Sequence, residues 1–267
     1  MFSVGFFLAL LVGVSLGLIG SGGSILTVPI LVYLLGVDPV SATGYSLFVV
    51  GISSLSGGIR NVFKQKLELK TILLFGLPSI FTVYFTRAIV VPAIPDIIFK
   101  AESFQLTKPV FLMILFAVVM VFASISMIRP CKDCEENNFT KLSSYHYSMI
   151  LLVGALVGVV TGLVGAGGGF LLIPALIFFA KMPMKKAVGT SLFIIAINSA
   201  IGFIGFMGST HSEIDWNLLI KFTTMSVVGI FIGIAISSKF SGEKLKASFG
   251  WFVLVMGFYI ITKELIL

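Results

Sequence analysis

Two short glycine clusters decide how this chain folds: GLIGSGGS at residues 17–24 and GLVGAGGG at residues 162–169. Each cluster ends an apolar run and is followed by a shorter one, at residues 24–36 and 169–180. As helices these shorter runs would be about 20 Å long, whereas a membrane-spanning helix must cross roughly 30 Å. Because glycine adopts positive φ at little cost, we expect each cluster to turn the chain back inside a membrane.

The glycine clusters belong to a longer internal repeat. Residues 12–57 align without a gap on residues 157–202, and 19 of the 46 paired positions are identical. Pro29 pairs with Pro174, and GYSLF at 44–48 pairs with GTSLF at 189–193. Internal repeats of this size are a known construction of secondary transporters. We therefore divide the chain into a first transmembrane repeat at 1–128, a cytoplasmic linker at 129–144 and a second transmembrane repeat at 145–267.

Composition places the chain in a membrane. Of its 267 residues 58% are hydrophobic and 11% are charged, and the mean hydropathy is +1.13. Soluble domains carry about 25% charged residues, so lipid must solvate part of this apolar surface. The apolar runs predict an all-α, polytopic transmembrane helical bundle made of two inverted repeats. Each repeat has about five membrane segments and one glycine-broken, re-entrant helix.

The distribution of basic residues supports the inverted arrangement. If each glycine cluster is a turn, one side of the membrane carries 13 of the 18 basic residues, at positions 60, 64, 66, 70, 129, 132, 141, 181, 185, 186, 239, 244 and 246. If each cluster only kinks a single span, eight spans result and the bias largely vanishes. The positive-inside rule favours the turn. We therefore predict that both termini lie outside the cell.

Several classes of function are excluded by missing motifs. The net charge of +7 raises the question of nucleic acid, but the basic residues lie in short loops, so no nucleic-acid partner is expected. The glycine clusters lack the Lys-Ser/Thr ending of a P-loop, and HExxH does not occur. We predict no enzyme activity and no cofactor.

The chain has two cysteines, Cys131 and Cys134, which supply half of a tetrahedral zinc site. His146 is the nearest histidine. A metal or redox site shared between the subunits of a homodimer stays an alternative, and the simpler interpretation is two ordinary thiols in a reducing compartment. We predict no metal site within the chain.

The glycine clusters are the predicted anion-binding site. A helix that begins inside the membrane exposes free N–H groups and the positive end of its dipole, and glycine lets an anion approach those donors closely. The candidate residues are Gly22, Gly23 and Ser24 in the first copy and Gly167, Gly168 and Gly169 in the second. The alternative is that these glycines only allow close packing of helices.

Polar residues in the helix after each short run extend the predicted site. Hydroxyls and an amide are neutral groups suited to a small oxyanion that must later leave. We assign Ser46 from the first copy and Thr190, Ser191 and Asn198 from the second. Hydrogen bonding between helices is the alternative role of such residues. Arg87 is a charged residue within a span, near its outer end; we expect it to snorkel to the interface, with anion attraction or gating as the alternative.

The paired clusters, each followed by Pro29 or Pro174 and then by GYSLF or GTSLF, resemble the TauE/SafE family of membrane transporters, the sulfite exporter family. The resemblance implies export of sulfite or other small sulfur-containing anions, such as organosulfonates, across the plasma (inner) membrane of a prokaryote. The first copy departs from the all-glycine form at Ser21 and Ser24, and Tyr45 stands where the second copy has Thr190. These departures leave the exact substrate open.

The leading hypothesis is a secondary transporter that works by alternating access in a lipid bilayer, with a small anionic sulfur compound as its substrate. An anion channel, or a transporter of another organosulfur compound, shares every sequence feature above. An intramembrane enzyme or an assembly subunit is the third class, and the missing catalytic set argues against the enzyme.

Overall fold

The computed structural model describes residues 2–19, 21–62, 69–101, 104–128, 144–179, 182, 184–209, 214–237 and 242–266. Residues 129–143, almost all of the predicted linker, lie outside the described residues, and so do Cys131 and Cys134.

The first half of the chain is helical except for one hairpin. Its elements are α1 (Phe2–Ile19), the 3-10 helix η1 (Ser21–Leu26), α2 (Thr27–Pro29), the π-helix η2 (Ile30–Leu34), α3 (Pro39–Val62), α4 (Leu69–Phe85), the π-helix η3 (Thr86–Val90), α5 (Val91–Ala93), β1 (Ile97–Ala101), β2 (Phe104–Thr107) and α6 (Lys108–Ile128). The second half comprises α7 (Ser144–Val164), α8 (Gly169–Phe178), α9 (Met184–Ser209), α10 (Trp216–Ser237) and α11 (Gly242–Ile266).

The predicted membrane fold is confirmed in its main features. Within the described residues, six helices are long and apolar enough to cross a membrane, and three shorter apolar helices accompany them, at Gly5–Leu18, Gly23–Leu34 and Ser148–Val164. Large apolar side chains such as Leu77, Phe81 and Phe122 are more than half exposed on the bundle surface, where lipid would cover them. The chain is thus a multi-pass membrane protein surrounded by a lipid bilayer.

Helices of the two halves pack against one another rather than separately. α1 runs along α10, α4 along α7 and α6 along α11, while α3 packs against α9. Small residues bring the paired backbones close: a Cβ on Gly13 would lie 2.9 Å from the Cα of Gly229, and one on Gly17 would lie 2.8 Å from the Cα of Gly233. Such contacts between small residues are how membrane helices associate.

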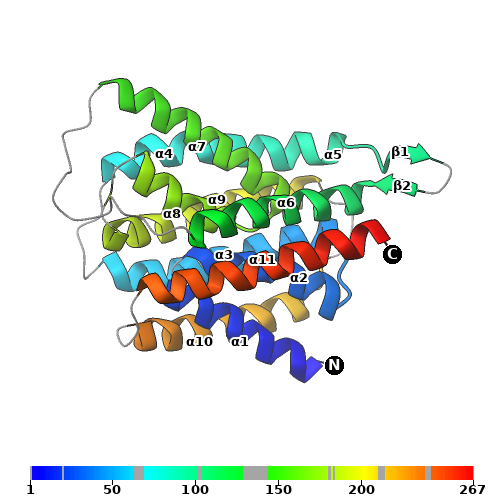
Figure 1. Ribbon diagram of the computed structural model, residues 1–267, viewed down its shortest axis with the longest axis horizontal. Coiled ribbons are helices and arrows are strands. Elements are labelled where there is room, and N and C mark those ends of the chain that lie inside the picture. The colour runs from blue at the N-terminus through cyan, green and yellow to red at the C-terminus, as the bar shows by residue number, and fades with distance from the viewer. Residues whose placement is uncertain are drawn as a thin grey trace.

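The antiparallel hairpin β1–β2 departs from the all-α expectation. It lies at one end of the bundle, the hairpin end, where α1 also begins and α11 ends (Figure 1). Pro95 explains the break, because a proline disfavours helical backbone in the preceding residue. Ile94 is accordingly extended, with φ −68° and ψ 122°, and α5 stops at Ala93.

The two short segments after the glycine clusters differ from each other. In the second copy α8 begins at Gly169, as predicted. In the first copy the short helix Gly23–Leu34 is irregular: a 3-10 helix passes through Gly22 and Gly23, followed by one α-helical turn and a π-helical turn. In the second copy Gly165, Gly167 and Gly168 instead take up positive φ and reset the chain direction before α8.

Candidate functional site

The turn between α7 and α8 depends on glycine. Gly165, Gly167 and Gly168 have φ of 73°, 67° and 67°, a conformation that L side chains rarely adopt. The N–H of Gly165 donates to the carbonyl of Thr161 at 2.9 Å, which closes the last turn of α7. The carbonyl of Gly168 accepts from the N–H groups of Leu171 and Leu172, both at 3.0 Å, which starts α8. The turn therefore ends one membrane helix and begins another inside the protein.

This turn is seated against helices from both halves of the chain. A Cβ on Gly165 would lie 2.5 Å from the Cβ of Thr43 on α3, and one on Gly167 would lie 2.8 Å from both Val50 Cγ1 on α3 and Ser199 Oγ on α9. A Cβ on Gly168 would meet Thr161 Oγ1 on α7. No side chain fits at these positions, so the backbone of the turn itself faces α3 and α9.

The two glycine-bearing segments contact each other. Gly23 rests against the backbone of Leu16, which folds η1 back onto α1, and η1 packs against α8. Ile25 and Val28 from the first segment share one buried cluster with Ala166 and Phe170 from the second. The structure thus brings Gly23 and Ser24 into the same interior as Gly167, Gly168 and Gly169.

Buried hydroxyl and amide oxygens without a hydrogen-bond partner occur on several helices, and those of Thr161 and Ser199 face the glycine turn. Among the described side chains they are Thr27 Oγ1, Ser46 Oγ, Ser54 Oγ, Thr161 Oγ1, Ser199 Oγ and Asn198 Oδ1. Leaving such a group unsatisfied costs about 1–3 kcal/mol, and native proteins contain few of them. The two hydroxyls that face the turn indicate a place where a polar ligand or water completes the bonding.

Ser199 lies at the centre of the arrangement. Its side chain is fully buried. Its Cβ would lie 3.2 Å from a Cβ on Gly51 of α3, and its Oγ faces Gly167 on the opposite side. Gly51 of α3 and Gly167 of the turn therefore leave room around one free hydroxyl.

The four predicted polar residues are all buried, but their roles differ. Ser46 keeps an unpaired hydroxyl. Ser191 donates its hydroxyl to the carbonyl of Val188 in the preceding turn, at 2.9 Å. Asn198 donates from Nδ2 to Ser79 Oγ on α4 at 2.6 Å, which leaves its Oδ1 free. Thr190 is 1% exposed on α9.

Thr27, Ser54, Thr161 and Ser199 were missing from the predicted site. Ser54 and Ser199 occupy the same position in the two repeats and are identical, a signal that sequence alone could have used. Thr161 pairs with Leu16 and Thr27 with Leu172, so the repeat carries no signal for these two threonines.

Arg87 contradicts the expectation that it snorkels. Its side chain is 1% exposed and lies inside the bundle, with Cζ 5.7 Å from the centroid of the Phe206 ring. The sequence shows how far along a helix Arg87 lies. It does not show which face of the helix Arg87 occupies, because the π-helix η3 interrupts the regular α-helical turn.

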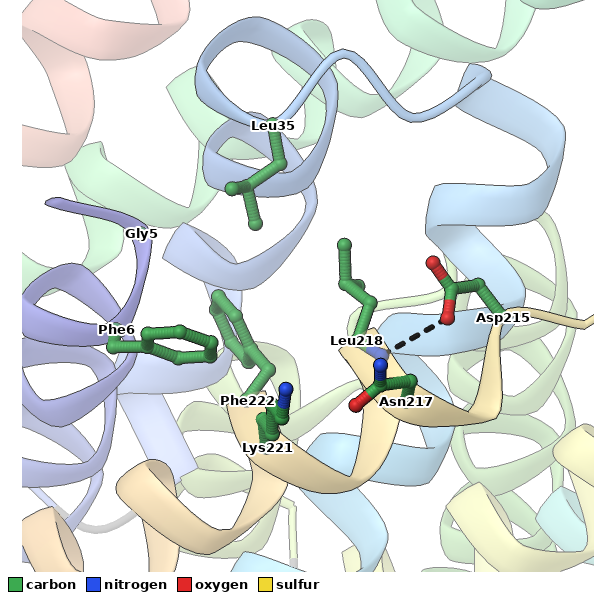
Figure 2. Close-up of a pocket in the computed structure, with 8 residues that line it drawn as sticks. All are labelled: Gly5, Phe6, Leu35, Asp215, Asn217, Leu218, Lys221 and Phe222. Carbon is green, nitrogen blue, oxygen red and sulfur yellow. Dashed lines mark hydrogen bonds between the residues drawn. The ribbon is translucent and has the colours of Figure 1, made fainter. Parts of the chain in front are cut away.

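A pocket of about 260 Å³ lies away from these residues, between α1, the end of η2 and the start of α10. Figure 2 shows Phe6 and Phe222 on one side of it and Asp215 and Asn217 on the other. Its lining includes none of the predicted site residues. No group of three histidine, cysteine or acidic residues placed to hold a metal ion occurs in the part of the chain that the structure describes.

Comparison with known proteins gives one family. The profile of the family described as "Sulfite exporter TauE/SafE" matches residues 5–260. A probable membrane transporter protein of Xylella fastidiosa is 28% identical over 95% of this chain and 92% of its own length. The probable membrane transporter protein MJ0441 of Methanocaldococcus jannaschii is 29% identical over 95% and 94%, and YunE of Bacillus subtilis is 29% identical over 87% of each chain.

No solved structure matches the chain significantly. The family match extends over nearly the whole chain, including both glycine clusters and α3 and α9. It confirms the resemblance seen in the sequence and identifies a transporter rather than an enzyme. The chain belongs to the TauE/SafE sulfite exporter family and is a multi-pass membrane transporter.

Proposed function

We propose that this protein exports sulfite or a related small sulfur-containing anion, such as an organosulfonate, by alternating access across the plasma membrane of a prokaryote. The observation that carries the proposal is the pair of unpaired buried hydroxyls, those of Thr161 and Ser199, that face the glycine turn before α8. The name of the matched family supplies the sulfur chemistry.

The proposed binding site combines backbone and neutral side chains. It comprises Gly22, Gly23, Ser24 and Ser46 from the first half and Gly167, Gly168, Gly169, Thr190, Ser191 and Asn198 from the second. To these we add Ser54, Thr161 and Ser199. The α8 N-terminus contributes the positive end of its helix dipole, while the unpaired hydroxyls can donate to oxyanion oxygens.

The charge of the interior favours an anion. Among the described side chains, Arg87 is the charged residue that is buried, and it is a cation. Buried carboxylates would be expected of a site for cations. The neutral donors of the proposed site would bind an anion weakly enough to release it.

We propose further that the two halves form an inverted repeat. Two features support this. α1 begins at the hairpin end, whereas α7 begins at the opposite end (Figure 1). The helix contacts also exchange between the halves: α1 packs along α10 in the way that its repeat partner α7 packs along α4. Alternating access then follows if one half rocks against the other around the glycine turns.

The direction of the chain in the membrane follows from its charges. α4, α9 and α11 begin at the end opposite the hairpin (Figure 1), and Lys70, Lys185, Lys186, Lys244 and Lys246 lie within their first five residues. By the positive-inside rule this end faces the cytoplasm, and the hairpin end faces outward.

Counterflow tests the proposed function. Proteoliposomes of the purified protein would be preloaded with unlabelled sulfite and given a trace of labelled sulfite outside. A carrier produces transient accumulation of label above equilibrium, and competition by organosulfonates would rank the substrates. Rapid equilibration without an overshoot would identify a channel instead, and no protein-dependent uptake would refute sulfite as the substrate.

A further inference from the structure

Arg87 occupies an unusual place for a charged residue. It is 1% exposed and lies in the span Lys70–Ala93, on the π-helix η3. η3 directly precedes α5, which lies at the hairpin end of the bundle (Figure 1). Charged side chains inside membrane segments are costly and mark functional sites, and single π-helical turns are frequent at such sites.

Helix α9 is shaped to accept this side chain. A Cβ on Gly205 would lie 3.0 Å from the Cβ of Arg87, so a glycine at this position lets η3 and α9 approach. The next residue, Phe206, places its ring 5.7 Å from the guanidinium carbon. Aromatic faces attract cations at this distance, and the ring stabilises the guanidinium while covering it.

Phe206 belongs to an aromatic layer that connects α9 to α3. Its ring meets that of Tyr45 edge-on with centroids 6.4 Å apart, and it lies 6.1 Å from that of Phe203. The layer continues from Phe203 to Phe48 at 5.0 Å and to Trp216 at 6.2 Å. Tyr45 and Phe48 lie near the start of α3, and Phe203 and Phe206 near the end of α9, which puts the layer on the hairpin side of Ser54 and Ser199.

The positions that correspond to these residues in the other half of the chain, 145 residues away, hold different residue types. The position 145 residues after Arg87 holds Ile232, which is 40% exposed on the bundle surface. Tyr45 pairs with Thr190, Phe203 with Gly58 and Phe206 with Asn61. Among the residues that the structure describes, the buried cation and its aromatic cover therefore occur at one end of the bundle only.

We propose that Arg87 is the first binding residue for the anion on the outer side of the transport path, and that the Phe206 ring is the gate that covers it. This inference rests on the proposed function. A guanidinium offers paired N–H donors that match two oxygens of a sulfonate or sulfite. Movement of the Phe206 ring exposes those donors to the outside, and its return closes the path.

The test compares the two sides of the membrane. Labelled-sulfite counterflow is measured in right-side-out and in inside-out vesicles that contain wild-type protein or the variants Arg87→Gln, Arg87→Lys and Phe206→Leu. Lys100→Gln is the matched control, because it removes an exposed cation from the hairpin at the same end. Protein amounts in the membranes are matched by immunoblot.

The proposal predicts a one-sided effect. Arg87→Gln raises the external KM for sulfite about tenfold or more, since a charge-assisted bidentate contact is lost, while the maximal rate and the internal KM change less than about threefold. Arg87→Lys gives an intermediate external KM, because lysine keeps the positive charge but lacks the paired N–H donors of the guanidinium. Phe206→Leu increases entry of sulfite from outside, and Lys100→Gln behaves like wild type within about threefold.

An external KM unchanged in Arg87→Gln, or raised equally on both sides, would overturn the proposal. If Arg87→Gln does not insert, Arg87→Lys and Phe206→Leu decide: wild-type external kinetics in both would overturn it. Counterflow by the wild type together with an unaffected Arg87→Gln would refute this inference alone. Absence of counterflow by the wild type would refute the proposed function itself.

Discussion

Ser199 Oγ lies 2.8 Å from the point that a Cβ on Gly167 would occupy, and it has no hydrogen-bond partner among the described residues. The serine comes from α9 and the glycine from the turn before α8. A larger residue at 167 would fill the space beside the hydroxyl. The pair therefore joins the two parts of the proposed site, the glycine backbone and the free side-chain donors.

Gly167→Ala should abolish transport and lower stability. The new Cβ would lie 2.8 Å from both Ser199 Oγ and Val50 Cγ1, and the left-handed backbone adds about 1–2 kcal/mol for an L residue. Thermal unfolding in detergent and sulfite counterflow would measure the two effects. Gly208→Ala is the control, because nothing lies within 4 Å of that Cβ and the residue is on the surface of α9. Equal behaviour of the two variants would contradict the account.

Ser199→Ala should separate binding from stability. The hydroxyl has no partner in the protein, so its removal leaves stability unchanged or raises it by up to about 1 kcal/mol. Loss of one donor to a bound anion should raise the sulfite KM about tenfold.

The control for Ser199→Ala is Ser56→Ala on α3, whose hydroxyl donates to the carbonyl of Ile52 at 2.9 Å. That variant should keep the wild-type KM. A Ser199→Ala protein that is destabilised by several kcal/mol but binds normally would assign the serine to packing.

Asn198→Asp tests the sign of the substrate charge. The substitution is isosteric, and a new carboxylate beside the site would repel an anion by about 4 kcal/mol at 4 Å and an effective dielectric constant of 20. Counterflow should fall at least about 100-fold. Asn217→Asp, exposed at the start of α10, should leave the rate unchanged. Undiminished transport by Asn198→Asp at neutral pH would argue that no anion passes near this residue.

Cysteine labelling tests the orientation. In a Cys131→Ser/Cys134→Ser background, a membrane-impermeant thiol reagent should label Lys100→Cys from outside intact cells. It should label Lys70→Cys only after the membrane is opened. Both positions are exposed, and they lie in the hairpin and at the opposite start of α4. The reverse pattern would show that the hairpin end faces the cytoplasm.

The sequence predicted the backbone of the candidate site better than its side chains. Positive φ at Gly165, Gly167 and Gly168, and a helix that begins at Gly169, follow from the conformational freedom of glycine and from the length of the apolar run. The hydroxyl of Thr161 was missed because its importance depends on the turn folding back over α7, a contact that no local pattern records.

Arg87 and the first glycine cluster show where local patterns fail. Hydropathy shows how far along its membrane span Arg87 lies. It does not show that Arg87 is on the face of η3 that packs inside the bundle. The match between GLIGSGGS and GLVGAGGG predicts two equal turns, yet η1 continues as a 3-10 helix through Gly22 and Gly23. Glycine permits a left-handed turn without requiring one, so packing against α1 and α8 determines the outcome.

The central claim is that a small sulfur oxyanion binds between the glycine turn and the hydroxyls of α7 and α9. Equilibrium binding of labelled sulfite to the purified protein tests it most directly, with wild type, Ser199→Ala and Ser56→Ala measured in parallel. The account predicts one saturable site per chain that organosulfonates compete for, with affinity reduced about tenfold in Ser199→Ala and unchanged in Ser56→Ala. Saturable binding of equal affinity in all three proteins would contradict it.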